Sequence, residues 1–379
     1  MLKWTDPSMN KDLFLKQLEQ SAREKKIPLN GAFELTPRCS LKCEMCYIRL
    51  DGDQVYRYGR ELSADEWIDL GRQAAEMGTY NLLLTGGEVF IRRDFFRIYE
   101  ALSEMGFRIF IISNATLITP EIAEQLAKRP PDEIKITLYG DSKDTYRKIC
   151  GAASGYDQAH KGIENLLSVG LRPAIQTTVT CENREDAFAI AAYAVDKGLS
   201  FTWDCMLFKE RKETDLSSMQ KRLSPKEAAF FDAAMREHMS SLYSHKSQPQ
   251  ENGYKEETIV STDLMHIADE SQNLQIPCAL GKSVFWITWD GKMTPCGRAD
   301  FPSSNPLDCG LKEAWEAFIN KCGSICIPQQ CIRCQYEEYC KFCPCANAAG
   351  TGEYGQVDPY YCEYAKTAFQ IKAEQGNKY

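Results

Sequence analysis

Between about residues 30 and 240, short apolar runs alternate with longer amphipathic segments. The short runs have the length of strands, and the longer segments carry apolar residues at the spacing of helices. The expected strands cover 31–37, 80–87, 108–113, 133–140, 172–180 and 200–208. The expected helices cover 62–78, 93–106, 119–129, a two-part stretch 142–169, 184–198 and 224–239. Two helix starts carry local signals, a capping box at Ser63 and Glu66 and a Thr119-Pro120 start.

Six strand-then-helix units in succession predict a parallel sheet, because right-handed crossovers place successive strands side by side. The apolar strands suit burial on both faces. Six units are fewer than the eight that close a full barrel, so we expect an α/β fold with a partial (β/α)6 barrel of the TIM type. Ligands of such sheets lie at the carboxyl ends of the strands.

The chain divides into five expected parts. A helical N-terminal segment, the barrel, a polar linker or insertion, a small cysteine-rich domain and a C-terminal tail cover 1–30, 31–240, 241–277, 278–365 and 366–379. The weak periodicity of the linker and the concentration of cysteines beyond it set these boundaries. A closing helix is expected from residue 359 onward.

Composition narrows the class of protein. The formal charge of −8 gives no footprint for nucleic acid, and no apolar run approaches the ~20 residues that span a bilayer. The N-terminus lacks the apolar core of a signal peptide. We therefore expect a cytoplasmic protein with neither nucleic acid nor a membrane as partner. In a reducing compartment, seventeen cysteines indicate metal ligation rather than disulfides.

Cys39, Cys43 and Cys46 lie in the stretch TPRCSLKCEMCY, directly after the first expected strand. A zinc site would need four ligands, and neither a histidine nor a fourth cysteine is near. Buried free thiols rarely cluster on a polar loop. Three thiolates can hold three irons of a [4Fe–4S] cubane and leave the fourth iron open, whereas ferredoxin-type carriers use four cysteines. We therefore interpret this loop as an open-iron cluster site.

With Tyr47 after the last cysteine, the loop resembles the signature of radical S-adenosylmethionine (SAM) enzymes. The resemblance implies that the open iron binds the amino and carboxylate groups of SAM. It further implies that an electron from a flavodoxin- or ferredoxin-type donor splits SAM. The resulting 5′-deoxyadenosyl radical then abstracts a hydrogen atom from the substrate.

Other strand ends resemble the SAM-contacting motifs of this family. TGGEVF resembles a Gly-Gly-Glu motif that contacts the ammonium of SAM, although a tight turn would also explain two glycines. The resemblance gives these cofactor-binding candidates: Tyr47, Gly86, Gly87, Glu88, Ser113, Asn114, Thr137, Arg147 and Asn183. The chain departs from the family pattern at Val89, Ala115, Tyr139 and Cys150. For the hydroxyl and amide residues, hydrogen bonding that ends a strand is an equally good explanation.

Eleven cysteines fall between Cys278 and Cys362. Cys278 is followed by twelve residues, Gly291, four residues and Cys296. Farther on, four cysteines stand at spacings of two, five and two, namely Cys331, Cys334, Cys340 and Cys343. A zinc ribbon separates its pairs by roughly 15–20 residues, so five is too few. The array instead resembles the SPASM domain, which carries two auxiliary [4Fe–4S] clusters.

The resemblance assigns the cysteines to the two auxiliary clusters. The first takes Cys278, Cys296 and Cys343, and the second takes Cys331, Cys334, Cys340 and Cys362. The fourth ligand of the first stays open among Cys309, Cys322, Cys326 and Cys345, or the site is open and suited to a substrate thiolate. The segment WITWDG is expected to form a small hairpin in this domain, and Cys150, Cys181 and Cys205 are interpreted as buried small residues.

Together the motifs predict a radical SAM/SPASM enzyme. The resemblance to this branch favours a ribosomally synthesised peptide as the substrate. The modification would be a thioether or carbon–carbon crosslink or a related oxidation. Only 38 residues precede Cys39, so we expect a separate leader-binding partner, or residues 241–276, to recognise the peptide. The alternatives are sulfatase-maturase-like oxidation of Cys or Ser, a small-molecule or cofactor-biosynthesis dehydrogenase, and a non-catalytic electron carrier. The general base is not identified, with Tyr139, Asp204 and Glu210 as barrel-mouth candidates.

Overall fold

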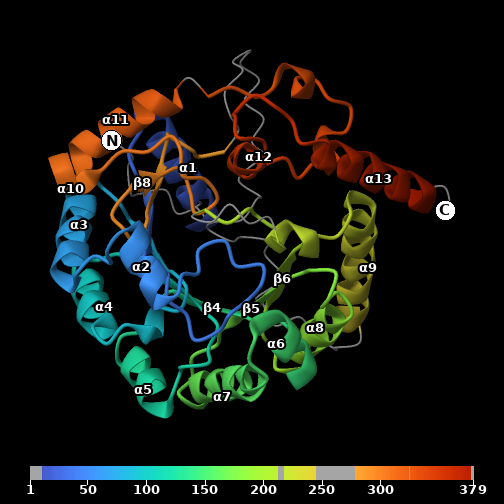
Figure 1. Cartoon of the computed structure of the whole chain (residues 1–379), viewed down its shortest axis with the longest axis horizontal. Helices are drawn as coiled ribbons and strands as arrows, with labels where there is room; N and C mark the ends of the chain where they lie inside the picture. The colour runs from blue at the N-terminus through green and yellow to red at the C-terminus, as the bar shows by residue number, and fades with distance from the viewer. Residues whose placement is uncertain (1–10, 212–216, 245–277, 324, 377–379) are drawn as a thin grey trace.

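Strands and helices alternate along residues 30–244 in the order that the sequence predicts. The structure, a computed structural model, describes residues 11–211, 217–244, 278–323 and 325–376 (Figure 1). The predicted linker 241–277 lies outside the described residues beyond 244, as do residues 1–10 and 377–379 of the predicted terminal segments.

The strands are β1 (Asn30–Glu34), β2 (Asn81–Thr85), β3 (Arg108–Ser113), β4 (Glu133–Thr137), β5 (Ala174–Thr178), β6 (Phe201–Asp204), β7 (Val284–Ile287) and β8 (Met293–Thr294). The helices of the first part are α1 (Lys11–Lys25), α2 (Gly52–Tyr58), α3 (Ala64–Glu76), α4 (Phe95–Glu104), α5 (Pro120–Lys128), α6 (Lys143–Cys150), α7 (Ser154–Ser168), α8 (Asp186–Asp196) and α9 (Pro225–Ser244). The helices of the C-terminal part are α10 (Pro306–Cys309), α11 (Leu311–Cys322), α12 (Pro344–Thr351) and α13 (Pro359–Gly376).

Both predicted helix starts are confirmed. Ser63 and Glu66 form a reciprocal capping box at the start of α3. Thr119 accepts a hydrogen bond from the Ile122 amide at the start of α5, with Pro120 in the first turn.

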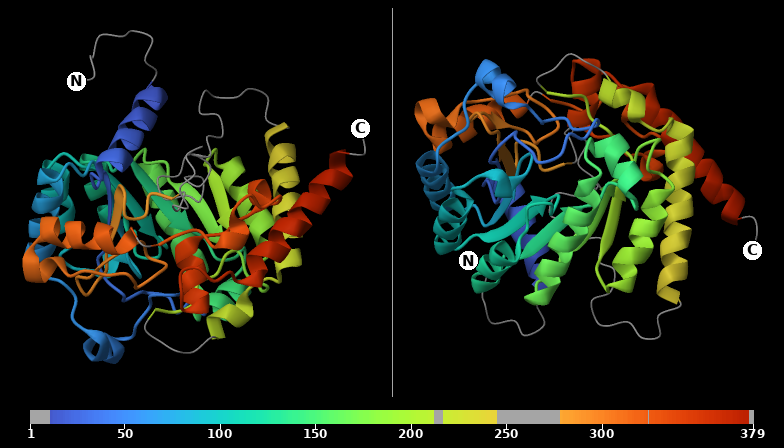
Figure 2. Two further views of the ribbon diagram at one scale, coloured as in Figure 1. Left: turned by 90° about the horizontal axis from the view of Figure 1, so that it is seen from above. Right: turned by 60° about the horizontal axis from the view of Figure 1, so that its bottom comes forward.

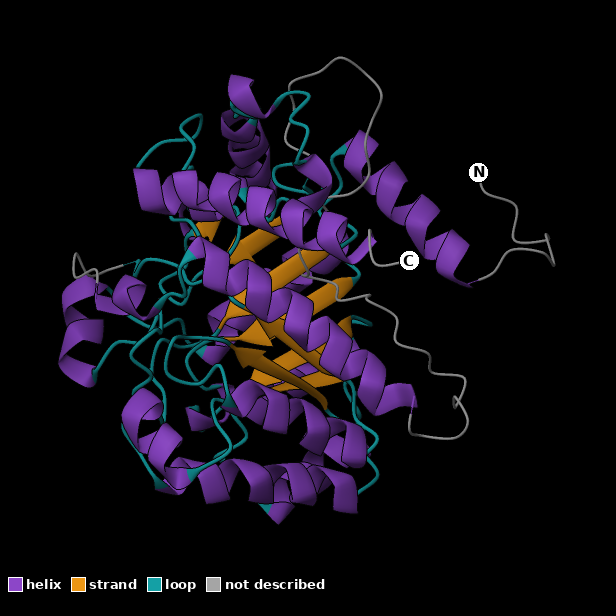
Figure 3. Ribbon diagram, turned by 90° about the vertical axis from the view of Figure 1, so that its right-hand side faces the viewer, coloured by secondary structure: helices purple, strands orange, loops and turns teal. Residues whose placement is uncertain are grey.

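Within the described ranges, the strands form one eight-stranded sheet in the order β6-β5-β4-β3-β2-β1-β7-β8. The first six are parallel neighbours, which confirms the partial barrel, and helices cover its outer side (Figures 1 and 3). The predicted hairpin is present, because β7 pairs antiparallel with β8. However, β7 also pairs in parallel with β1, so the sheet continues across the predicted boundary at residue 278. The division into five domains stays a prediction.

Alternation along the strands separates an outer core from an inner layer. Phe33, Leu82 and Ile111 belong to the large core cluster, which also contains residues of the covering helices. Their strand neighbours Ala32, Leu83, Phe110 and Trp286 form a separate small cluster, and the pairing register places them in one row across four strands. The inner face of the barrel is therefore closed by this apolar row below its carboxyl end.

The C-terminal part spans the open side of the barrel. At one edge, α11 packs on α3, where the Leu311 amide donates to the Gln73 Oε1 at 2.7 Å. At the other edge α13 packs on α9, where Asp232, buried in α9, accepts hydrogen bonds from Tyr364 and Lys341. Figure 1 shows this orange-to-red part above the sheet, between α3 and α9. In the described residues, no helix has the length and hydropathy needed to cross a membrane.

Candidate active site

The loop with the three cysteines leaves the carboxyl end of β1. Figure 2 shows α1 at one end of the barrel and α2, which follows the loop, at the other. The loop is held by long-range backbone hydrogen bonds: the amides of Lys42 and Glu44 donate to the carbonyls of Cys150 and Ile149, at 2.8 and 3.0 Å. The C-terminal turn of α6 therefore fixes the loop on one side.

The turn after β2 fixes the loop on its other side. The amide of Gly87 donates to the Thr36 carbonyl at 2.7 Å, and the amide of Glu88 donates to the Arg38 carbonyl at 2.9 Å. A Cβ at Gly86 would lie 2.4 Å from the Thr36 oxygen, and one at Gly87 would lie 2.3 Å from the Arg38 oxygen. Glycine is required here because two backbones pass in direct contact.

The structure brings the three thiols of the loop together in a largely buried space. Burial, together with a smaller effect of neighbouring cysteines, raises the pKa of Cys39 to about 12 and that of Cys46 to about 11. The pKa of Cys43 is raised by a hydrogen bond with Cys150 and by burial. Binding to a cationic cluster is the physical change that would make these thiols thiolates.

Amide donors already point at the sulfur atoms of this loop. The Leu41 amide donates to Cys39 Sγ at 3.4 Å, and the amides of Ile48 and Arg49 donate to Cys46. The Asn114 side chain, from the end of β3, also donates to Cys39 Sγ at 3.3 Å. Such N–H donors stabilise thiolate sulfur and tune the potential of iron–sulfur clusters. The donor set therefore fits an iron–sulfur cluster held by this loop.

Glu88 turns inward from the loop. Its carboxylate is fully buried and accepts hydrogen bonds from the Ser113 hydroxyl at 2.9 and 3.0 Å, the Asn114 amide at 2.8 Å and the Phe90 amide at 3.2 Å. Burial raises the pKa of this carboxyl group to about 7, against the opposing effect of these hydrogen bonds. The group therefore joins the ends of β2 and β3, and its predicted contact with SAM stays a prediction.

Two of the other cofactor-binding candidates lie at strand ends and are buried. Thr137 belongs to the inner face of β4, where its hydroxyl accepts a hydrogen bond from Gln176 at 2.7 Å. Asn183 donates to the Tyr139 carbonyl at 2.9 Å and accepts from the Thr180 amide at 2.7 Å, so it ties the ends of β4 and β5 together.

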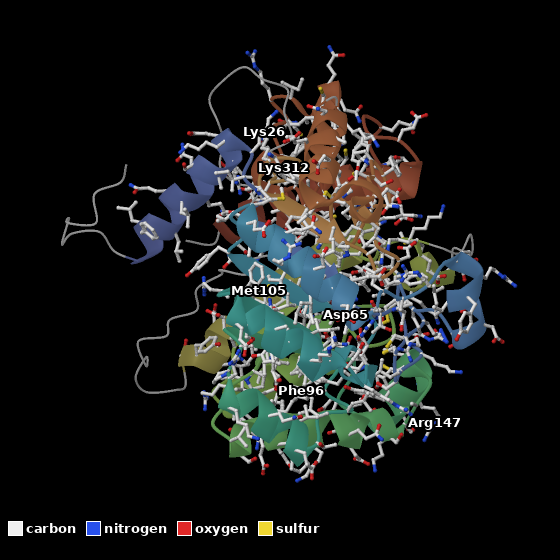
Figure 4. All side chains as sticks on the ribbon, turned by 90° about the vertical axis from the view of Figure 1, so that its left-hand side faces the viewer. Lys26, Asp65, Phe96, Met105, Arg147 and Lys312 are labelled. Atoms are coloured by element: carbon white, nitrogen blue, oxygen red, sulfur yellow. The ribbon has the colours of Figure 1, made fainter. Side chains whose placement is uncertain are left out.

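Arg147 and Tyr47 lie in different surroundings. Arg147 is exposed at the edge of the molecule, where it pairs with Asp144 on the same helix (Figure 4). Its predicted contact with SAM stays a prediction. Tyr47 is partly buried, and a Cβ at Gly297 would lie 2.9 Å from its hydroxyl oxygen. It marks the point where the loop meets the C-terminal part.

A buried ion pair at the barrel mouth has no counterpart among the predicted site residues. Glu34, on the inner face of β1, accepts two hydrogen bonds from Arg211 at 2.5 Å each and one from Trp286 Nε1 at 3.1 Å. Arg211 also lies over the Tyr47 ring at 5.6 Å. A glutamate inside an apolar strand was the available sequence signal for Glu34, whereas nothing local distinguishes Arg211.

The C-terminal cysteines gather in two sets, and each set unites the residues that the resemblance assigned to one auxiliary cluster. Cys278 interacts with Cys296 and Cys343, and Cys340 interacts with Cys331, Cys334 and Cys362. The sulfur atoms of Cys278, Cys296 and Cys340 each accept a hydrogen bond from the backbone amide two residues later in the chain, as the sulfur of Cys39 does. The donor chemistry therefore fits iron–sulfur clusters here too.

Arg298 connects the first of these sets to the barrel. Its Nη1 lies 3.7 Å from Cys343 Sγ, its Nη2 lies 3.7 Å from Asp204 at the end of β6, and its guanidinium lies 4.4 Å from the Phe208 ring centre. The first auxiliary set thus adjoins the barrel mouth. Among the described residues, no group of three Cys, His, Asp or Glu side chains lies close enough to hold a single metal ion.

Residues 33–194 match the family model of the radical SAM superfamily. The chain carries a radical SAM domain. Over 340 residues it is 25% identical to the AdoMet-dependent heme synthase of Methanosarcina barkeri, an alignment that covers 88% of this chain and 95% of that protein.

Two solved structures share the fold. SuiB of Streptococcus suis bound to precursor peptide SuiA is 17% identical with a TM-score of 0.66, and the match covers 95% of this chain and 83% of that chain. Native anSMEcpe with bound AdoMet and Cp18Cys peptide is 17% identical with a TM-score of 0.65, and the match covers 92% of this chain and 97% of that chain.

The radical SAM domain accounts for a [4Fe–4S] cluster and SAM as cofactors, and the C-terminal cysteines fit auxiliary clusters. The matched domain supports a radical SAM enzyme rather than a non-catalytic electron carrier. Which individual residues bind SAM and the clusters stays a prediction.

Proposed function

We propose that this radical SAM enzyme modifies a ribosomally synthesised peptide at the mouth of the barrel, by a thioether or carbon–carbon crosslink or a related oxidation. When bound, the cluster on Cys39, Cys43 and Cys46 supplies the electron that cleaves SAM, and the auxiliary clusters accept the electron that the substrate radical loses. For a crosslink the substrate would lose two hydrogens in total: one as an atom to the 5′-deoxyadenosyl radical, giving 5′-deoxyadenosine, and one as a proton released to solvent with an electron passed to the auxiliary clusters.

The observation that carries the proposal is the bridge made by Arg298. This partly buried side chain joins Cys343 of the first auxiliary set to Asp204 on the inner face of β6. A substrate at the barrel mouth would then lie between the SAM-cleaving loop and an acceptor of electrons. Such a placement suits an oxidation in which one electron enters through SAM and one leaves the substrate.

The peptide class is supported by the two chains that share this fold along nearly their whole length and were crystallised with peptides. The lining of the mouth agrees with this class of substrate. Glu34 with Arg211 and Asp204 with Arg298 are paired charges of opposite sign on the inner face, and they suit the alternating donors and acceptors of a peptide backbone. We further propose that a separate partner, or the segment 241–276, recognises the peptide.

A second candidate is the synthesis of a tetrapyrrole cofactor. The specific observation in its favour is the similarity to the heme synthase, which extends over 88% of this chain and 95% of that protein. Arginines at the barrel mouth would in that case bind carboxylate side chains of the substrate.

The experiment is anaerobic reconstitution followed by incubation with SAM and dithionite. Two substrates are tested in parallel: a short peptide encoded beside this gene, and an iron-containing tetrapyrrole that carries propionates. Loss of about two hydrogens from the peptide, seen by mass spectrometry and dependent on SAM, supports the proposal. Turnover of the tetrapyrrole alone supports the second candidate. A triple alanine variant of Cys39, Cys43 and Cys46 is the control, and absence of 5′-deoxyadenosine from the loaded wild type contradicts both candidates.

A further inference from the structure

The first auxiliary set has three assigned cysteines, and whether a fourth protein thiolate completes it decides what the site can do. A closed cluster, in which each iron has a protein ligand, can only transfer electrons, whereas an open iron can also bind a substrate thiolate. The sequence leaves four candidates, Cys309, Cys322, Cys326 and Cys345.

Cys345 lies within the first auxiliary set. Its sulfur is in hydrogen-bond contact with Cys296 and interacts with Cys343 and Cys278, the other two members. It is 2% exposed. The local sequence explains this placement, because Cys343 is the N-cap of α12 and Cys345 follows in its first turn.

A hydrogen bond holds Cys345 in this position. The Tyr354 hydroxyl lies 3.6 Å from its sulfur and donates to the Phe301 carbonyl at 2.7 Å. The hydroxyl therefore joins α12 to the chain segment after Cys296. The side chain of Cys345 is thus fixed toward the other three sulfur atoms rather than toward solvent.

The three competing cysteines have different surroundings. Cys309 is exposed, and its thiol donates to the carbonyls of Asn305 and Gly310 at 3.5 and 3.7 Å. Cys326 is exposed as well. Cys322 is buried, but within the set it interacts with Cys278 alone, and it packs against Gly281 at the end of α11. Cys345 is buried and interacts with all three members of the set, which distinguishes it from the exposed Cys309 and Cys326 and from Cys322.

We propose that Cys345 is the fourth thiolate of the first auxiliary cluster, so that Cys278, Cys296, Cys343 and Cys345 close it. This inference rests on the proposed function, since it assumes that the set carries a cluster. Its consequence is that the first auxiliary site transfers electrons and does not bind a substrate thiol. The substrate must then be held by the inner face of the barrel, where Glu34, Arg211 and Asp204 lie.

The test uses the anaerobically reconstituted full chain and measures iron content and the paramagnetic resonance spectrum of the reduced clusters. Wild type is expected to hold about twelve irons, four in each cubane. Cys345→Ala should lose up to about four irons or acquire the spectrum of a three-iron cluster, whereas the matched variant Cys322→Ala should match wild type. In wild type, an added small thiol such as 2-mercaptoethanol should leave the auxiliary signals unchanged, because the cluster is closed.

Two outcomes overturn the inference. One is a wild-type auxiliary signal that shifts on addition of the thiol, a measurement that needs no variant. The other is a Cys345→Ala protein that matches wild type beside a Cys278→Ala protein that has lost about four irons. Failure of the auxiliary-cluster proposal can be told apart from failure of the Cys345 assignment alone, because Cys278→Ala would then keep all its iron. In that case the Cys345 assignment would be wrong as well. SAM cleavage, which depends on Cys39, Cys43 and Cys46, is measured separately in each protein.

Discussion

The cysteine loop after β1 and the array at 331–343 are both proposed to hold iron–sulfur clusters, but the chain supports them in opposite ways. The loop is joined by backbone hydrogen bonds to the turn after β2 and to the end of α6, which lie about 50 and 110 residues away along the chain. In the array, two short 3₁₀ turns, η4 (Gln329–Cys331) and η5 (Glu337–Tyr339), are linked by backbone bonds that each reach back three residues.

The cysteine loop and the array also differ in how deeply their residues are buried. Leu41 and Met45 of the loop belong to the main core, at 2% and 6% exposure. Neither η4 nor η5 contains a buried residue. The array contacts the rest of the described chain through a few side chains, among them Lys341 with Asp232 and Tyr339 with Phe369. We therefore expect the barrel to build the first site before any cluster binds, and the array to depend more on its cluster for a defined shape.

The largest expected effect is a difference in SAM-cleavage activity between cysteine variants of the two regions. Cys43→Ala is expected to reduce release of 5′-deoxyadenosine to background, because only three thiols are available to hold the SAM-binding cluster. Cys331→Ala should keep SAM cleavage within about tenfold of wild type, since it alters a distant cluster. Chromatography of the reaction with dithionite and SAM measures both. Equal loss in the two variants would contradict the division.

Removal of iron should distinguish the two regions by how well their backbone amides stay protected from exchange. After chelation, amides in 329–343 are expected to exchange with deuterium about 100-fold faster or more, because local bonds alone hold this backbone. Amides of β1 and β2 should stay protected, since a buried sheet surrounds them. Hydrogen-exchange mass spectrometry of loaded and chelated protein makes the comparison. Protection of 329–343 that persists without iron would show that the array is shaped by the chain itself.

Glycine-to-alanine substitutions test how tightly the barrel turn and the C-terminal part are packed. Gly87→Ala puts a Cβ 2.3 Å from the Arg38 carbonyl oxygen and should destabilise the protein by about 3 kcal/mol, because backbone cannot move aside cheaply. Gly350→Ala in α12 is the matched control, since a Cβ there meets no atom within 4 Å. It should stabilise the helix by about 0.5–1 kcal/mol. Urea denaturation of both variants checks the two signs.

The smallest effect concerns the pH dependence that Glu88 gives the barrel. Its pKa is raised to about 7 in the folded chain, so the folded state binds the proton more tightly than the unfolded state does. The stabilisation is complete below the ordinary pKa of a glutamate and is lost as pH rises through about 7. Between pH 5 and pH 7 this amounts to about 2 kcal/mol.

Glu88→Gln should remove this slope, and urea midpoints at pH 5, 6 and 7 for both proteins measure the difference. A wild type and variant with parallel pH profiles would mean that Glu88 is already ionised in the folded state. The three hydrogen bonds that its carboxylate accepts would then outweigh its burial.

Much of this molecule follows from local sequence. The six strand–helix units were recognisable because side chains repeat with the periods of strands and helices, and the capping box at Ser63 is itself a local pattern. The cysteine array at 331–343 was recognisable by its spacing, since ligands on short turns stay close along the chain, whereas the resemblance to the SPASM domain supplied the assignment to two sets. Each of these features depends on residues within a few positions of one another.

Tertiary structure decided the contacts between distant segments. The pairing of β7 with β1, about 250 residues apart, leaves no mark on the sequence of either strand. The same holds for Arg211 against Glu34, for the inward turn of Glu88 and for Cys345 against Cys296. The sequence by itself determined which elements and ligand types exist, because those depend on local backbone energetics. Which of them meet at the barrel mouth depends on burying one common core, and only the folded chain fixes that.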